Sequence, residues 1–127
     1  MDRATAELRR AIDASGCVAQ AEVLRMDGTV RCSTGGFLTS VQEGRRLARL
    51  FENPADAVAA GITVGGVAYT AAEANGHLLH GRHADTGVVA VRRPPFIVVG
   101  LYPRGRQPSD AVLVLDELAA LLASGGH

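Results

Sequence analysis

Two residue types are absent from this 127-residue sequence: lysine and tryptophan. Because all 13 of its Lys/Arg-type residues are arginine, acetylation and ubiquitination of lysine side chains are excluded. The sequence also lacks an apolar run near the roughly 18 residues that a membrane-spanning helix requires. Its N-terminal residues mix charges of both signs and have no apolar centre, unlike a secretory signal, so we expect a cytoplasmic protein.

The protein also has no formal net charge at pH 7. The 13 arginines balance 13 acidic residues, so no overall field would steer the protein toward nucleic acid. A basic binding site would therefore have to be local. The arginines group at four places, which are most simply solvated faces of helices and turns: Arg9-Arg10, Arg45-Arg46 with Arg49, Arg92-Arg93, and Arg104 with Arg106.

Cysteine is too scarce for a disulfide framework, since the sequence contains only two. A two-residue hairpin turn at Asp27-Gly28 would place Cys32 opposite Val23 in the first predicted hairpin. Cys17 would then lie about 20 Å away, at about 3.3 Å per strand residue. We therefore expect two free, mostly buried thiols in a reducing compartment.

Catalytic constellations are equally scarce. His77, His80 and His83 are evenly spaced, but on a strand the first two point to opposite faces, so we interpret all three as surface histidines rather than as metal ligands. Asp116-Glu117 are adjacent on a predicted helix and point apart. The sequence therefore predicts neither an enzyme nor a cofactor or metal site.

The second half of the sequence is the informative part. Short apolar runs alternate with turn residues, in a length that fits one domain over residues 1–127. The runs are 62–64, 67–71, 77–79, 88–91 and 96–99, and the turns are 65–66, 75–76, 85–87 and 94–95. Because no crossover helix fits between the runs, the strands must pair antiparallel with their sequence neighbours.

Helices are predicted on both sides of these strands. The first runs from Asp2, its N-cap, to Ala14, and it is followed by a hairpin of residues 18–24 and 29–32. A capping box at residues 40–43 begins a second helix that ends near Phe51, and Asn53-Pro54 begins a short third helix that ends at Gly61.

The last helix carries more apolar surface than one contact requires. We expect Ser109 as its N-cap and Gly125-Gly126 as its end. Residues 112, 115, 118, 119 and 122 form the stripe that faces the sheet. Leu113, Val114 and Leu121 fall outside the stripe, which favours packing against the first helix or against a partner.

In the order of its elements and in several motifs, the sequence resembles the profilin family. The motifs are G-x-x-x-G-G-x-x-Y at residues 61–69, a basic turn at 81–83, T-G-x-x-x-x-basic-basic at 86–93, V-V-G-x-Y at 98–102, and a D-G hairpin at 26–30. The resemblance implies an α+β fold with a central antiparallel meander sheet. It further implies that the N- and C-terminal helices pack on one face and the short helices on the other.

The resemblance also implies a function. Profilins are not enzymes; they bind one actin monomer and regulate its polymerisation, and they bind proline-rich ligands and inositol phospholipids. By position, the implied actin-binding residues are Val58, Ala59, Ala68, Thr70, Glu73, Arg82, Val88, Ser109, Val112, Leu113, Asp116 and Glu117. The implied phospholipid-binding residues are Arg82, Arg92 and Arg93, although a histidine at position 83 replaces a basic family residue.

The proline-rich site is where the sequence departs from the family. Polyproline helices pack against aromatic rings, and the corresponding positions here are Arg3, Ala6, Arg31, Leu121 and His127. We therefore expect binding of proline-rich ligands to be lost or weak. The preferred hypothesis is an actin-monomer-binding protein associated with the cytoskeleton. The alternative is a profilin-fold module that binds another protein or an acidic lipid and not actin.

Overall fold

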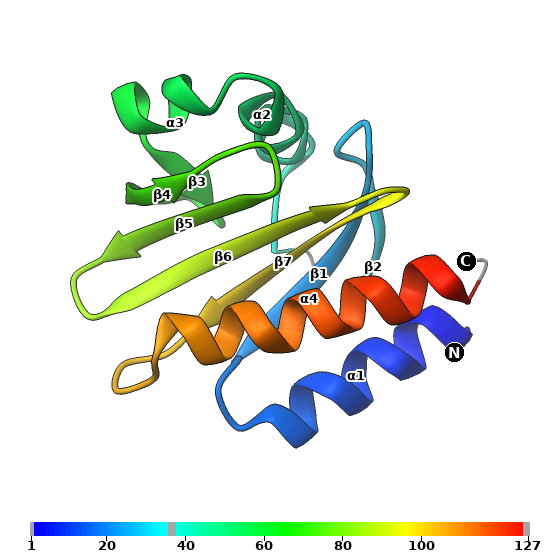
Figure 1. Cartoon of the computed structure of the whole chain (residues 1–127). Helices are drawn as coiled ribbons and strands as arrows, with labels where there is room; N and C mark the ends of the chain where they lie inside the picture. The colour runs from blue at the N-terminus through cyan, green and yellow to red at the C-terminus, as the bar shows by residue number, and fades with distance from the viewer. Residues whose placement is uncertain (1, 36–37, 126–127) are drawn as a thin grey trace.

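The computed structural model describes residues 2–35 and 38–125. These residues form one seven-stranded antiparallel sheet and four helices, and the strand order across the sheet is β2-β1-β7-β6-β5-β4-β3 (Figure 1). The strands are β1 (Gln20–Arg25), β2 (Val30–Ser33), β3 (Ile62–Val64), β4 (Val67–Ala74), β5 (Leu78–His83), β6 (Thr86–Arg93) and β7 (Phe96–Tyr102). The helices are α1 (Arg3–Ser15), α2 (Val41–Glu52), α3 (Pro54–Ala60) and α4 (Pro108–Ser124).

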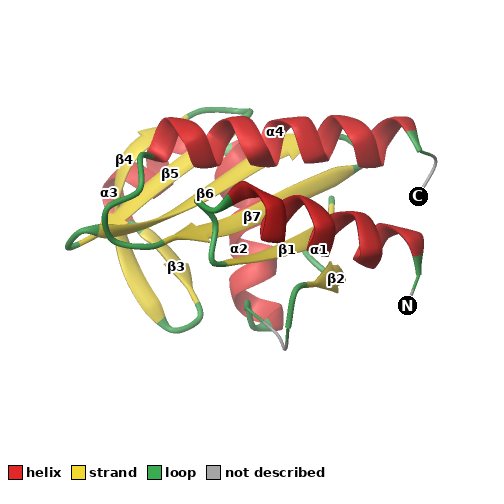
Figure 2. Cartoon of the chain, turned by 90° about the horizontal axis from the view of Figure 1, so that it is seen from below, coloured by secondary structure: helices red, strands yellow, loops and turns green. Residues whose placement is uncertain are grey.

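The helices form one layer on each face of the sheet. Helices α1 and α4 lie side by side on one face, and α2 and α3 lie on the other (Figures 1 and 2). Leu8 and Leu115 bury their side chains in the core beneath α1 and α4. Leu47 and Phe51 do so in the core beneath α2. The expected fold class is therefore confirmed, including the distribution of the helices over the two faces.

The meander of the second half is confirmed, but one of its turns was placed wrongly. Strands β3 to β7 are neighbours in sequence order. Residues 81–83, expected at a turn, are instead the end of β5, and His83 pairs with Thr86 of β6. Only Ala84 and Asp85 are left to make the turn, and Ala84 adopts a left-handed φ of 55°.

The first hairpin keeps the predicted pairing of Val23 with Cys32, but its turn is longer than predicted. The backbone N–H of Arg25 donates to the carbonyl of Thr29 at 2.8 Å, so three residues rather than two form the turn. An irregularity of register next to Val23 compensates for the extra residue. Cys17 and Cys32 are free and buried, as expected.

The caps of α1 and α2 follow the sequence rules. The side chain of Asp2 accepts from the N–H of Thr5 at 2.9 Å, and Gly16 ends the helix with a left-handed φ of 66°. Ser40 and Glu43 form the predicted capping box. Glu43 also accepts from the backbone N–H groups of the β3–β4 turn, which fixes that turn against the start of α2.

The start of α4 differs from the prediction. Gln107 is the N-cap, and Pro108 occupies the first turn, so Ser109 lies inside the helix and does not cap it. Proline suits the first helical position because its φ is fixed and its missing N–H would have no helical partner there. Gly125 ends the helix as predicted, while Gly126 lies outside the described residues.

Candidate partner-binding surface

Helix α4 leaves part of the sheet uncovered. It packs on β6 and β7, so the same face of β4 and β5 lies beyond its edge (Figure 1). The pairing register shows which side chains occupy this free area. His80 pairs with Val89 of the core beneath α4, and Glu73 pairs with His80, so these three share that face. Thr70 and Arg82 pair with each other on the same face.

Most residues proposed for actin binding gather around this free area and are exposed. Ala68, Thr70 and Glu73 come from β4, and Arg82 comes from β5. Ser109, Val112, Leu113 and Asp116 come from the first half of α4. We call these eight residues the β4–α4 surface. Val58 and Ala59 are exposed on α3, which packs against β4 next to the edge strand β3 and lies on the face of the sheet opposite to α4 (Figure 1).

The α4 side of this surface has an apolar centre. The side chain of Leu113 is 58% exposed, although the buried face of α4 is complete without it. Val112 and Asp116 line a hollow of about 420 Å³ together with His77 and Leu78 at the ends of the neighbouring strands. Val112 at the hollow and the exposed Leu113 after it therefore supply apolar area of the kind found at the centre of protein interfaces.

Two of the proposed residues do not belong to this surface. Val88 is buried in the core on the α2 side of the sheet, so its side chain cannot contact a partner. Glu117 lies on the other flank of α4, where it lines the groove toward α1 together with Val114 and Leu121. Alternation along β6 explains the first error, because Val88 and Val89 point to opposite faces.

A buried polar pair joins the free sheet area to the core beneath α4, and the sequence analysis did not identify it. His80 is only 9% exposed, and its Nε2 lies 2.6 Å from the hydroxyl of Tyr102. Burial, with a smaller contribution from Arg82, lowers the pKa of His80, whereas Glu73 opposes this shift. The expectation of a surface histidine is thus wrong for His80. It holds for His77 and His83, which are exposed.

Gly87 makes room for this pair. A Cβ at that position would overlap the ring of Tyr102. Burial raises the pKa of the Tyr102 hydroxyl, so it stays protonated at neutral pH. The three evenly spaced histidines do not converge, and the described part of the chain contains no group of three side chains that could hold a metal ion.

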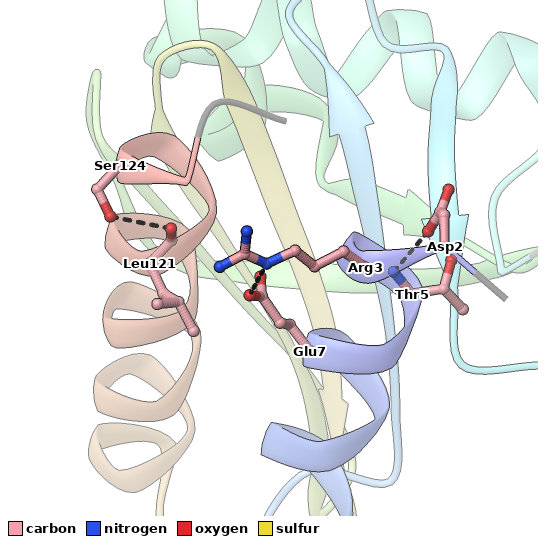
Figure 3. Close-up of polar contacts among 6 residues, drawn as sticks. All are labelled: Asp2, Arg3, Thr5, Glu7, Leu121 and Ser124. Atoms are coloured by element: carbon pink, nitrogen blue, oxygen red, sulfur yellow. Dashed lines mark hydrogen bonds and ion pairs between the residues drawn. The ribbon is translucent and has the colours of Figure 1, made fainter.

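Two positions of the implied proline-rich site are occupied by arginines that form ion pairs. Arg31 of β2 contacts Asp2 at 2.8 Å. Arg3 contacts Glu7 at 3.2 Å, as Figure 3 shows. The backbone N–H of Thr5 and the Arg31 guanidinium hold the pKa of Asp2 well below its usual range. We call Asp2, Arg3, Glu7 and Arg31 the α1–β2 ion-pair cluster.

The remaining positions of that site add no aromatic ring. Ala6 is half-buried on α1. Leu121 of α4 is 48% exposed, and the side chain of Arg3 extends from α1 toward it (Figure 3). His127 lies outside the described residues. The site is therefore made of charged and aliphatic side chains wherever the structure describes it.

The three arginines proposed for phospholipid binding do not share one surface. Arg93 contacts Asp116 of α4 at 3.4 Å. Arg92 contacts Glu52 of α2 at 3.1 Å, on the opposite face of the sheet. Arg82 alone belongs to the free area of β5. Alternation along β6 separates Arg92 from Arg93, which adjacency in the sequence had suggested to be one basic pair.

The chain is similar to profilins in sequence and in structure. The profilin family model matches residues 6–127. Profilin-1 of Dictyostelium discoideum is 35% identical over 101 residues, 80% of each chain. Profilin IA of Acanthamoeba castellanii has a TM-score of 0.88 at 29% identity, covering 97% of this chain and 98% of that one. LokiProfilin2, solved in a complex with rabbit actin, has a TM-score of 0.77 at 14% identity, covering 96% of this chain and 97% of that one; this match shows the fold alone.

Within residues 2–35 and 38–125, none of the helices combines the length and the apolar character needed to cross a bilayer.

Proposed function

Because the chain belongs to the profilin family, we propose that it binds monomeric actin through the β4–α4 surface and thereby regulates actin polymerisation. Val58 and Ala59 of α3 lie at the edge of this contact. The activity would be that of a stoichiometric binding protein, with no catalytic step and no cofactor. Its place in the cell would be with the actin cytoskeleton in the cytoplasm.

The exposure of Leu113 is the observation that carries this proposal. A leucine that is 58% exposed contributes little to the core, and here it follows Val112, which lines the hollow beside α4. Arg82 and Glu73 supply charges of both signs at the rim. An apolar centre with a polar rim is the arrangement that protein partners bind.

The test is a titration of the protein against monomeric actin, with pyrene-actin assembly as a second readout. We expect a one-to-one complex and a slower assembly of filaments. Leu113→Asp should raise the Kd at least about tenfold, because a charge would be buried at the centre of the contact. Leu121→Asp is the matched control, since Leu121 is 48% exposed on the same helix but on the flank toward α1.

Absence of binding by the wild-type protein at excess concentration would reject the proposal. The alternative hypothesis, a profilin-fold module with another protein partner, would then be favoured. Equal losses in the two aspartate variants would place the contact elsewhere on the molecule.

We further propose that proline-rich ligands are bound weakly or not at all. Arg3 and Arg31 stand where rings are needed, and Glu7 and Asp2 already neutralise their charges. Calorimetric titration with a proline decamer should give no measurable heat of binding, and a low-micromolar Kd would reject this. Phosphoinositides are left out of the proposed function because Arg92 faces away from Arg82 and Arg93.

A further inference from the structure

The hydrogen-bonded pair of His80 and Tyr102 lies inside the proposed contact area. His80 pairs across strands with Glu73, and it precedes Arg82 by two residues, so it shares their face of the sheet. A partner seated on the β4–α4 surface would cover all three side chains. His80 would then lose the little access to water that it has.

The groups that face His80 are few. Glu73 approaches from β4, Arg82 lies on β5 itself, and the Tyr102 hydroxyl approaches from β7. Asp85 and Arg104, beyond the strand ends, contact each other at 2.9 Å. On this face of β6, Gly87 and Val89 are uncharged, and Arg93 at the end of the strand contacts Asp116 of α4 at 3.4 Å. Ala111 and Leu115, which α4 buries against the sheet, are also uncharged.

We propose that His80 is a positioning residue for actin binding that must be neutral in the complex, so that affinity falls as the pH falls. This inference depends on the proposed function. In neutral His80, Nε2 and the hydroxyl of Tyr102 form a hydrogen bond at 2.6 Å that needs no water. A charged imidazolium beneath a docked partner would lose its hydration and would lie next to Arg82.

The direction of the effect follows from linkage. Burial already lowers the pKa of His80 in the free protein, and deeper burial in the complex lowers it further. Above the free-protein pKa both states hold a neutral ring, so pH has no effect through this group. Below it the free protein takes up a proton that the complex excludes, so the Kd rises by up to about tenfold per pH unit.

The experiment measures the Kd for monomeric actin from pH 7.5 to pH 5.5 with wild type and His80→Gln. Glutamine keeps an amide hydrogen-bonding group for Tyr102 but does not titrate. We expect the wild-type Kd to rise more steeply than that of His80→Gln once the pH falls through the free-protein pKa of His80. Protonation of groups on actin itself changes the Kd equally for wild type and for His80→Gln, so it cancels when the two pH profiles are compared. His83→Gln, at an exposed position, should behave like wild type.

Ring resonances of His80 give a second measurement that needs no variant. The pKa of His80 should lie below its ordinary value in the free protein and should fall further when actin is bound. Parallel pH profiles of wild type and His80→Gln, or an unchanged His80 pKa in the complex, would overturn the inference while leaving actin binding intact. Absence of actin binding at pH 7.5 would instead overturn the proposed function, and this inference with it.

Discussion

The two ends of α4 contact very different surroundings. Its first half borders the β4–α4 surface, where Leu113 is exposed without a partner in the core. Its second half lies next to the α1–β2 ion-pair cluster, where Arg3 and Arg31 each contact a carboxylate. Charges that are satisfied within the chain offer little to a ligand, whereas exposed apolar area gains from being covered. The comparison therefore favours the first half of α4 for the partner binding that we propose.

The largest effect is expected from a substitution next to Tyr102, in the core beneath α4. Gly87→Ala places a Cβ into the ring of Tyr102, so the ring must move or the strands must separate. We expect a loss of about 2–3 kcal/mol in the free energy of unfolding, as for other overpacked sites, and weaker actin binding. Denaturant unfolding and actin titration are the measurements.

Gly35→Ala is the control for this variant. A Cβ at Gly35 meets nothing within 4 Å, and no left-handed φ makes alanine costly there. Its stability should match wild type within about 0.5 kcal/mol. If Gly87→Ala were as stable as Gly35→Ala, the close packing of Tyr102 on Gly87 would not be required to form the β4–α4 surface.

A second prediction tests how far the surface extends onto α3. Val58 is 72% exposed there, and Val58→Asp should raise the Kd for actin about fivefold, because a rim position contributes less than a central one. Val41→Asp is the matched control on α2, since Val41 is 63% exposed and lines a pocket with Thr29 and Val30 of the first hairpin. Equal affinities for the two variants would remove α3 from the proposed contact.

Elements set by short-range rules were predicted well. The caps at Asp2 and Ser40 depend on residues within one helical turn, and both were found as predicted. The start of α4 was missed because Pro108 and Ser109 each favour a helix start, and the fixed φ of proline prevailed.

The long-range contacts could not be predicted. His80 and Tyr102 are 22 residues apart, and Arg31 and Asp2 are 29 apart, so their meeting depends on the register of several strands and on how a helix packs. The same limit applies to the candidate surface. The family resemblance selected its residues, but it also selected Val88 and Glu117, because motif positions do not indicate which face of a strand or helix a side chain occupies.

A third prediction concerns the α1–β2 ion-pair cluster in acid. The Thr5 N–H and Arg31 lower the pKa of Asp2 in the folded protein, so its contribution to stability is present above the unfolded-state value of about 4. That contribution is lost as the pH falls below this value toward the folded-state pKa. Asp2→Ala should therefore lower the Tm at pH 7, and its difference from wild type should shrink by pH 3.

Asp2→Asn separates the two interactions of this residue. Asparagine keeps the N-cap to Thr5 but loses the charge that pairs with Arg31. Its Tm at pH 7 should lie between those of wild type and Asp2→Ala. Actin affinity should be unchanged in both variants, and a change in it would contradict the separation of the two ends of α4.

The smallest expected effect is a gain of proline-rich ligand binding next to the second half of α4. In Arg3→Trp/Arg31→Trp, two indole rings replace two guanidinium groups that now contact carboxylates. Flat rings with an N–H donor can pack on proline and bond a peptide carbonyl, so we expect a proline decamer to bind with a Kd on the order of 1 mM. Arg9→Trp/Arg10→Trp adds the same rings at exposed positions of α1 outside the cluster. Calorimetric or fluorescence titration should detect binding in the first variant only; equal binding by both would mean that tryptophan content, rather than the position of the rings beside α4, determines affinity.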